Sequence, residues 1–162
     1  MLNKQDIYNI LDENKIAYTV VDHPAVFSGD AMDTMDIPGI EKVIKNLFLR
    51  DAKGKNYFLV VLSLHKKANL DKIRGWLGSS RLGFASEERL MEYLEITPGS
   101  VSPLCILNGK AENVKVVFDK ELLGFDCIGM HPCDNTASVF MKLSDVISLI
   151  EDKAKEILYL EI

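Results

Sequence analysis

Hydrophobic and polar positions switch between a helical and a strand-like spacing along the chain, without a regular βαβ rhythm. Apolar residues at helical spacing predict a short amphipathic helix over residues 4–14. A second helix is expected over 69–77, between an asparagine cap and a terminal glycine. Ser86 and Ser144 are the expected N-caps of two further helices.

Strand-like runs account for most of the remaining chain. They are expected at 17–21, 43–50, 57–64, 114–118, 125–130, 137–142 and 157–162. The second and third runs are separated by a glycine-containing loop, which predicts a hairpin. Residues 25–41, with three spaced acids and a Pro-Gly pair, are expected to be irregular. This mixture predicts an α+β fold with a mixed, mainly antiparallel sheet flanked by helices. Because no linker or repeat interrupts it, we expect one domain over residues 1–162.

A lysine interrupts the apolar strand 43–50. Period-2 alternation places Lys45 on the same face as Val43, Leu47 and Leu49. Burying an ammonium group without a partner is unfavourable, so Lys45 either reaches water past an apolar stem or points into a pocket that needs a cation. The alternation alone slightly favours the first interpretation.

Composition excludes several classes of protein. The chain has 162 residues, 48% of them hydrophobic and 27% charged, as in ordinary globular proteins. No run reaches the roughly 18 to 20 apolar residues of a membrane span, and the charged N-terminus does not resemble a signal peptide. Three cysteines, an odd number, argue against a disulfide framework and for the reducing cytoplasm. Cys127, His131 and Cys133 lack the paired spacing of zinc ligands, so we expect neither metal nor cofactor.

Charge is distributed unevenly along the chain. Between Lys42 and Arg81, ten basic residues face two acidic ones, a formal balance of +8, whereas the rest of the chain has a formal charge of −13. The overall charge is −5. Such asymmetry is compatible with a polyanionic partner and equally with a solvated basic face that binds nothing.

Few local motifs point to chemistry. The chain has no P-loop, dinucleotide fingerprint, zinc-protease motif or G-x-S-x-G elbow. The loop Gly99–Pro103 offers accessible amides for a carboxylate, a phosphate or a developing oxyanion, or it is a plain connector. His131 and His23 are each either a chemical group of a site or a structural loop histidine.

Three segments together resemble a known family. The run KNLFLRD at 45–51 with KGK at 53–55, the G-x-x-x-P loop at 99–103, and His-Pro at 131–132 with Asn-Thr at 135–136 resemble the YbaK/ProX superfamily. Its members are free-standing relatives of the editing domain inserted in bacterial prolyl-tRNA synthetase. The resemblance covers nearly the whole chain in order, and the first and third segments are most similar to the ProX branch.

The resemblance implies hydrolysis, in trans, of Ala-tRNA(Pro). Alternatives are deacylation of Cys-tRNA(Pro) or another aminoacyl-tRNA, a different small ester as substrate, and a non-catalytic tRNA-binding module. The implied partners are the acceptor end of tRNA(Pro) and, as an open question, prolyl-tRNA synthetase. No membrane partner is expected.

The resemblance also implies a site. The expected catalytic residues are Lys45, Asn46, Gly99, Ser100, Val101, Ser102 and His131. The expected substrate-binding residues are His23, Ser28, Arg50, Pro103, Asn135 and Thr136, of which Ser28 stands where relatives often carry threonine. In this arrangement the 99–103 amides stabilise the oxyanion while Lys45 binds a phosphate or orients the ester. Lys45 is therefore better explained as a cation aimed at a tRNA 3′ end than as a snorkelling side chain.

Overall fold

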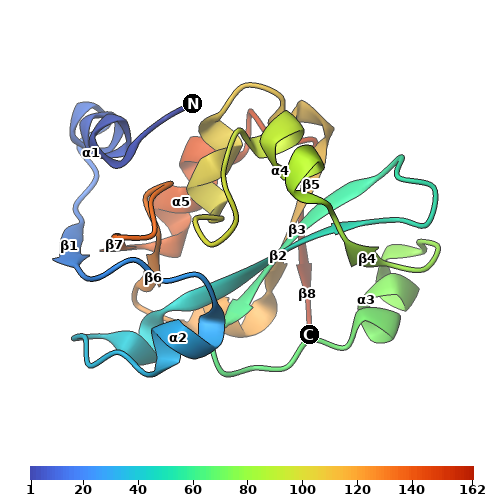
Figure 1. The fold of residues 1–162 in the computed structure, drawn as a ribbon, viewed down its shortest axis with the longest axis horizontal. Helices are drawn as coiled ribbons and strands as arrows, with labels where there is room; N and C mark the ends of the chain where they lie inside the picture. Colours follow the sequence, from blue (N-terminus) through green and yellow to red (C-terminus); the bar gives the residue numbers. More distant parts are fainter.

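Two β-sheets with helices around them make up the fold (Figure 1). The computed structural model describes residues 1–162. Its helices are α1 (Lys4–Glu13), α2 (Gly29–Asp33), α3 (Leu70–Leu77), α4 (Glu87–Leu94) and α5 (Leu143–Ile150). Its 3₁₀ helices are η1 (Ile40–Lys42), η2 (Pro103–Leu107), η3 (Ala111–Asn113) and η4 (Lys120–Gly124). Its strands are β1 (Thr19–Asp22), β2 (Ile44–Arg50), β3 (Tyr57–Ser63), β4 (Gly83–Phe84), β5 (Val114–Asp119), β6 (Ile128–Met130), β7 (Ala137–Met141) and β8 (Glu156–Leu160).

The larger sheet has the order β4-β2-β3-β5-β8, and the smaller one has the order β1-β7-β6. Strands β2 and β3 form the expected hairpin, which crosses the molecule in Figure 1. Four of the six strand pairings are antiparallel, while β3–β5 and β5–β8 are parallel. The prediction of an α+β fold with mixed, mainly antiparallel pairing is confirmed. The strands are divided between two sheets, which a single bridge between Val43 and Gly129 connects.

Both faces of the larger sheet are covered. On one face, a cluster of 26 buried residues joins the sheet to α4, α5 and η2 and extends to the smaller sheet and α1, and the other face packs against α3 in a smaller cluster. Strand β3 lies between these layers, so its residues from Tyr57 to Leu62 are all buried. This explains why its sequence is a continuous apolar run and not an alternating one.

Local capping explains where several helices begin. In α1, Asn3 and Asp6 form a reciprocal capping box. The predicted caps Asn69 and Ser86 are confirmed, since each side-chain oxygen accepts an amide hydrogen bond from the first turn of its helix. No helix is long and apolar enough to cross a membrane.

Two expectations about local structure were wrong, and one short strand was not predicted. Residues 25–41 contain α2 and η1, because Ser28 caps a helix that is too short to show an apolar period. Lys142, and not Ser144, is the N-cap of α5, because burial of Leu143 draws the first turn back by two residues. The two-residue strand β4 lies at the sheet edge and leaves no periodic signal.

Candidate functional site

A cleft of about 220 Å³ opens beside the first half of β2, where the strand no longer pairs with β4. This is smaller than the roughly 300–1,000 Å³ of typical ligand pockets, so the cleft suits a small group. Segments from both sheets and from the loops between them line it. The lining residues are Val26, Phe27, Ser28, Gly29, Met32, Val43, Ile44, Lys45, Asn46, Leu64, Gly99, Val101, Met130, His131 and Ser138.

Lys45 enters this cleft from β2 with its positive charge unpaired. It is half-buried, and its ammonium group makes no hydrogen bond or ion pair with the protein. Burial lowers the pKa of Lys45, the charge of Lys67 lowers it further, and Asp30 opposes the shift. A cation left without a partner in a concave site is a binding group for an anion or an electron-rich oxygen.

Asn46 connects β2 to the Gly99–Pro103 loop. Its Nδ2 donates a hydrogen bond of 3.1 Å to the carbonyl oxygen of Val101. Because that carbonyl can only accept, the orientation of the side-chain amide is determined. The Oδ1 of Asn46 is therefore left as a buried acceptor with no donor in the protein. Such an atom is rare in folded proteins, and a ligand that carries a donor would satisfy it.

Two residues of the Gly99–Pro103 loop, Gly99 and Val101, line the cleft. Gly99 has φ +86°, and a Cβ there would lie 3.1 Å from both the Cα of Phe27 and the carbonyl oxygen of Val26. Glycine is therefore required for the loop to approach this segment. The amides of Gly99 and Val101 donate to no acceptor in the protein. These two N–H groups are candidates for holding an oxyanion.

The side chains of the same loop point into the protein. Ser100, Ser102 and Pro103 are buried, and none of them lines the cleft. Ser102 caps η2 by accepting the amide of Leu104 at 3.2 Å, and Pro103 is the first residue of that helix. These three residues determine the shape of the loop. The loop can therefore offer backbone amides to a ligand in the cleft, but not the hydroxyl groups of Ser100 and Ser102.

His131 offers a single ring nitrogen to the cleft. Its Nδ1 lies 2.9 Å from the carbonyl oxygen of Ala137, so Nδ1 carries the proton and Nε2 has a free lone pair. Burial lowers the pKa of His131, and the neighbouring His23 lowers it further. The Ala137 carbonyl and Asp134 oppose that shift. The neutral ring is thus an acceptor for a hydroxyl, an ammonium group or a water.

His23 does not line the cleft but contacts two residues that do, Ser138 and His131. Its Nδ1 lies 2.9 Å from the carbonyl oxygen of Pro24, and its Nε2 lies 3.0 Å from the Oγ of Ser138. Its ring centroid is 5.7 Å from that of His131. Ser138 lines the cleft but is 0% exposed, so this serine–histidine pair does not present an accessible nucleophile.

The other expected substrate-binding residues take different positions. Ser28 caps α2 and lines the cleft. Arg50 lies five residues beyond Lys45, roughly 17 Å away at about 3.3 Å per residue, and binds the hairpin carbonyls of Asp51 and Ala52. The structure therefore does not bring Arg50 to the cleft, because β2 carries it to the opposite end of the sheet.

Asn135 and Thr136 hold the segment before α2. The Nδ2 of Asn135 donates to the carbonyl oxygen of Val26 at 2.7 Å, and the carbonyl oxygen of Asn135 accepts the amide of Val26. The carbonyl oxygen of Thr136 accepts the amide of His23, while its Oγ1 binds Lys4 and Asp134. Neither side chain lines the cleft, so their role in this structure is to position the residues that do.

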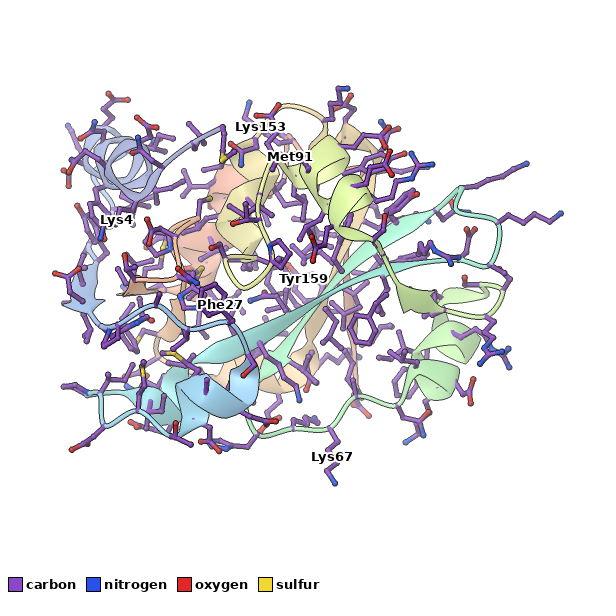
Figure 2. All side chains as sticks on the ribbon, in the orientation of Figure 1. Lys4, Phe27, Lys67, Met91, Lys153 and Tyr159 are labelled. Carbon is purple, nitrogen blue, oxygen red and sulfur yellow. The ribbon has the colours of Figure 1, made fainter.

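Ion pairs neutralise some of the basic residues between Lys42 and Arg81 and leave others free. Lys42 pairs with Asp126 at 2.8 Å, and Lys66 pairs with Asp119 at 2.7 Å and Glu121 at 3.2 Å. These acids come from outside the basic span, so part of its charge is neutralised. Lys67, by contrast, is exposed and extends away from the ribbon in Figure 2.

Sequence reasoning missed Ser138 and the apolar lining. Ser138 is the only polar residue of β7, which is the same signal that drew attention to Lys45 in β2. Met32, Leu64 and Met130 gave no such signal, since apolar residues that line a cleft look like ordinary core residues in a sequence.

Comparison with known proteins identifies the family. A model of the aminoacyl-tRNA editing domain matches residues 26–149, which include every residue that lines the cleft. The chain belongs to the aminoacyl-tRNA editing domain family. This membership confirms the resemblance seen in the sequence and makes the protein an aminoacyl-tRNA editing hydrolase.

Three similar proteins each match most of the chain. The chain is 43% identical to the prolyl-tRNA editing protein ProX of Acetoanaerobium sticklandii over 148 residues, 91% of this chain and 90% of that protein. It is 33% identical to a mouse prolyl-tRNA synthetase associated domain-containing protein over 140 residues, 82% and 80% of the two chains. A solved structure of a candidate trans-editing enzyme for prolyl tRNA synthetase superposes with a TM-score of 0.70 at 19% identity, covering 96% of each chain. That structure supports the fold.

Proposed function

We propose that this protein removes alanine from mischarged tRNA(Pro) by hydrolysing the ester bond in trans. The observation that carries the proposal is the unpaired ammonium group of Lys45 in a small cleft that also holds two unengaged amides and the free Nε2 of His131. The similarity to a prolyl-tRNA editing protein supports tRNA(Pro) as the carrier. The small volume of the cleft supports alanine as the amino acid.

The ester carbonyl fits the Gly99–Val101 amides. As water attacks, negative charge develops on the carbonyl oxygen, and N–H groups already in place stabilise it without reorganising. Removal of one such donor typically reduces turnover by about 10²–10³-fold, so two backbone amides supply a large share of the catalysis.

The remaining polar groups suit the rest of the aminoacyl end. The ammonium of Lys45 binds the phosphate of the terminal adenosine or orients the ester. The orphaned Oδ1 of Asn46 accepts a hydrogen bond from the α-ammonium group of the amino acid. The Nε2 of His131 accepts one from the ribose hydroxyl or from the attacking water. None of these roles needs a covalent intermediate.

Alanine and proline are distinguished by size in this proposal. Apolar side chains close the cleft, Met32, Leu64 and Met130 among them, and they exclude the larger proline ring. A pocket of this kind separates groups that differ by one methylene by only about 1–3 kcal/mol, so glycine and serine are expected to enter as well. Contacts with the tRNA must then add to the selectivity.

A deacylation assay tests the proposal. The purified protein is incubated with tRNA(Pro) charged with alanine, cysteine, serine or proline, and release of each amino acid is followed. Fast release of alanine with proline retained supports the proposal. Preferential release of cysteine would reassign the substrate, and tRNA binding without release would leave a non-catalytic binding module.

Salt dependence tests the contact with tRNA. The exposed Lys67, whose charge lowers the pKa of Lys45, extends the positive potential of the cleft towards the surface. Phosphate contacts release counterions, so KM for tRNA should rise steeply between low and moderate salt. A KM that does not change with salt would remove the basic residues from the proposed interface.

A further inference from the structure

A buried thiol holds the backbone of the Gly99–Pro103 loop. The Sγ of Cys105 lies 3.4 Å from the amide nitrogen of Ser102 and 3.7 Å from the carbonyl oxygen of Ser100. It also lies 3.4 Å from the Sγ of Cys133. Cys105 is 0% exposed, so no water competes for these contacts.

The donors and acceptors around this sulfur are consistent with one another. Cys105 donates its thiol proton to the carbonyl of Ser100 and accepts the amide proton of Ser102. Cys133 then donates its own proton to the Sγ of Cys105. The hydrogen bond to Cys105, together with burial, raises the pKa of Cys133, which keeps that proton in place.

The two backbone groups that Cys105 holds lie on either side of Val101. Val101 carries one of the unengaged amides of the cleft, and its carbonyl oxygen accepts the hydrogen bond from Asn46. Cys133 lies two residues after His131 in the sequence. The pair of thiols therefore links the loop that offers the amides to the segment that offers the imidazole.

We propose that Cys105 is a positioning residue, whose hydrogen bonds to Ser100 and Ser102 hold the Val101 amide at the place where the oxyanion forms. This inference rests on the proposed deacylase function and adds a residue to it. Cys133 supports Cys105 through the contact between the sulfurs. The competing explanation is that Cys105 only fills space, as a buried cysteine commonly does.

Two substitutions that differ by one hydroxyl group separate these explanations. Cys105→Ala removes the hydrogen bonds, while Cys105→Ser keeps a donor and an acceptor with a similar volume. If the bonds position the loop, C105A lowers kcat on Ala-tRNA(Pro) by about tenfold or more with little change in KM, because small displacements of a catalytic group can reduce the rate by about 10²-fold. C105S then retains most of the activity.

Cys127 provides the matched control. It is the third cysteine, it is half-buried, and it does not line the cleft, so Cys127→Ser should leave both constants unchanged. A wild-type kcat for C105A would overturn the proposal. So would a C105S variant that is slower than C105A, since filling of apolar space favours alanine over a buried hydroxyl group.

Amide hydrogen exchange tests the same contact without relying on activity. The Ser102 amide should exchange at least about tenfold faster in C105A than in the wild type and C105S, while the amides of β3 remain protected. Unchanged protection of Ser102 in C105A would overturn the proposal even if turnover falls. If the wild type released no alanine, the proposed function would fail while this measurement still decided the role of the thiol.

The serine variant covers the case in which C105A does not fold. C105S should fold, protect the Ser102 amide and keep kcat within about threefold of the wild type, because its hydroxyl group makes stronger hydrogen bonds than a thiol. A folded C105S with a kcat reduced by about tenfold or more would overturn the proposal.

Discussion

Substitution of Lys45 by methionine should separate activity from stability. Methionine keeps an unbranched apolar stem of similar length and removes only the charge. Because Lys45 has no ion pair or hydrogen bond in the protein, this change leaves no partner group unsatisfied. It also removes the unfavourable desolvation that lowers the pKa of the lysine.

The environment of Lys45 sets the expected changes in kcat/KM and in the free energy of unfolding. A charge-assisted contact that acts mainly in the transition state contributes about 2–4 kcal/mol, so kcat/KM should fall by roughly 30- to 900-fold. The free energy of unfolding should stay constant or rise by up to about 1 kcal/mol, as is usual when a functional group is removed from an unfavourable position. Lys45→Ala should lose similar activity but more stability, because it also deletes the stem.

Deacylation of Ala-tRNA(Pro) and thermal unfolding measure the two quantities on the same preparations. Lys67→Met is the matched control, because it removes a nearby charge that is exposed and outside the cleft. It should weaken tRNA binding slightly and leave kcat unchanged. A Lys45→Met variant with nearly wild-type kcat/KM would refute the assignment of Lys45 to the chemistry, and one destabilised by several kcal/mol would show that the ammonium has a structural partner.

Three further substitutions test the rest of the site. The pKa of His131 lies below its usual value of about 6.5, so the unfolded chain binds the proton first as the pH falls. Stability should therefore decrease below about pH 6.5, whereas kcat should decrease only at lower pH, once the lowered pKa of the folded protein is reached. His131→Gln should flatten the His131 part of both profiles, as measured by unfolding and deacylation across pH. Gly99→Ala should destabilise the protein by about 1–3 kcal/mol in denaturant unfolding and reduce turnover strongly, since φ is +86° and the new Cβ would press on Val26 and Phe27; wild-type values would contradict this. Ser138→Ala should reduce kcat by less than about tenfold, because the serine is buried and only supports His23; an acyl-enzyme trapped on Ser138 in rapid-quench experiments would instead establish covalent catalysis.

Local signals in the sequence determined most of the helices and strands. Asn69 and Ser86 began helices as expected, and the apolar runs on either side of residues 51–56 formed the hairpin. Capping and alternation depend on neighbours within a few residues, so the sequence contains them in full. The short helix α2 was not predicted because five residues are too few to show an apolar period, and the early start of α5 was not predicted because burial of Leu143 outweighed the local pattern.

The sequence by itself also marked Lys45 as unusual, but alternation could not say where its charge goes. That depends on Leu64, Met130 and the Gly99–Pro103 loop, which lie far from Lys45 in the chain and meet it only in the folded protein. The same limit applies to Arg50, which shares a motif with Lys45 but lies at the other end of the strand.

Tertiary structure alone decided which charges remain free and which polar atoms remain unpaired. Lys42 and Lys66 are neutralised by acids from distant segments, whereas Lys45 is not. Asn46 has an orphaned oxygen because a carbonyl more than fifty residues away takes its amide. Burial and pairing are properties of what lies opposite a residue in space, so the sequence determined the candidates and the fold selected the site among them.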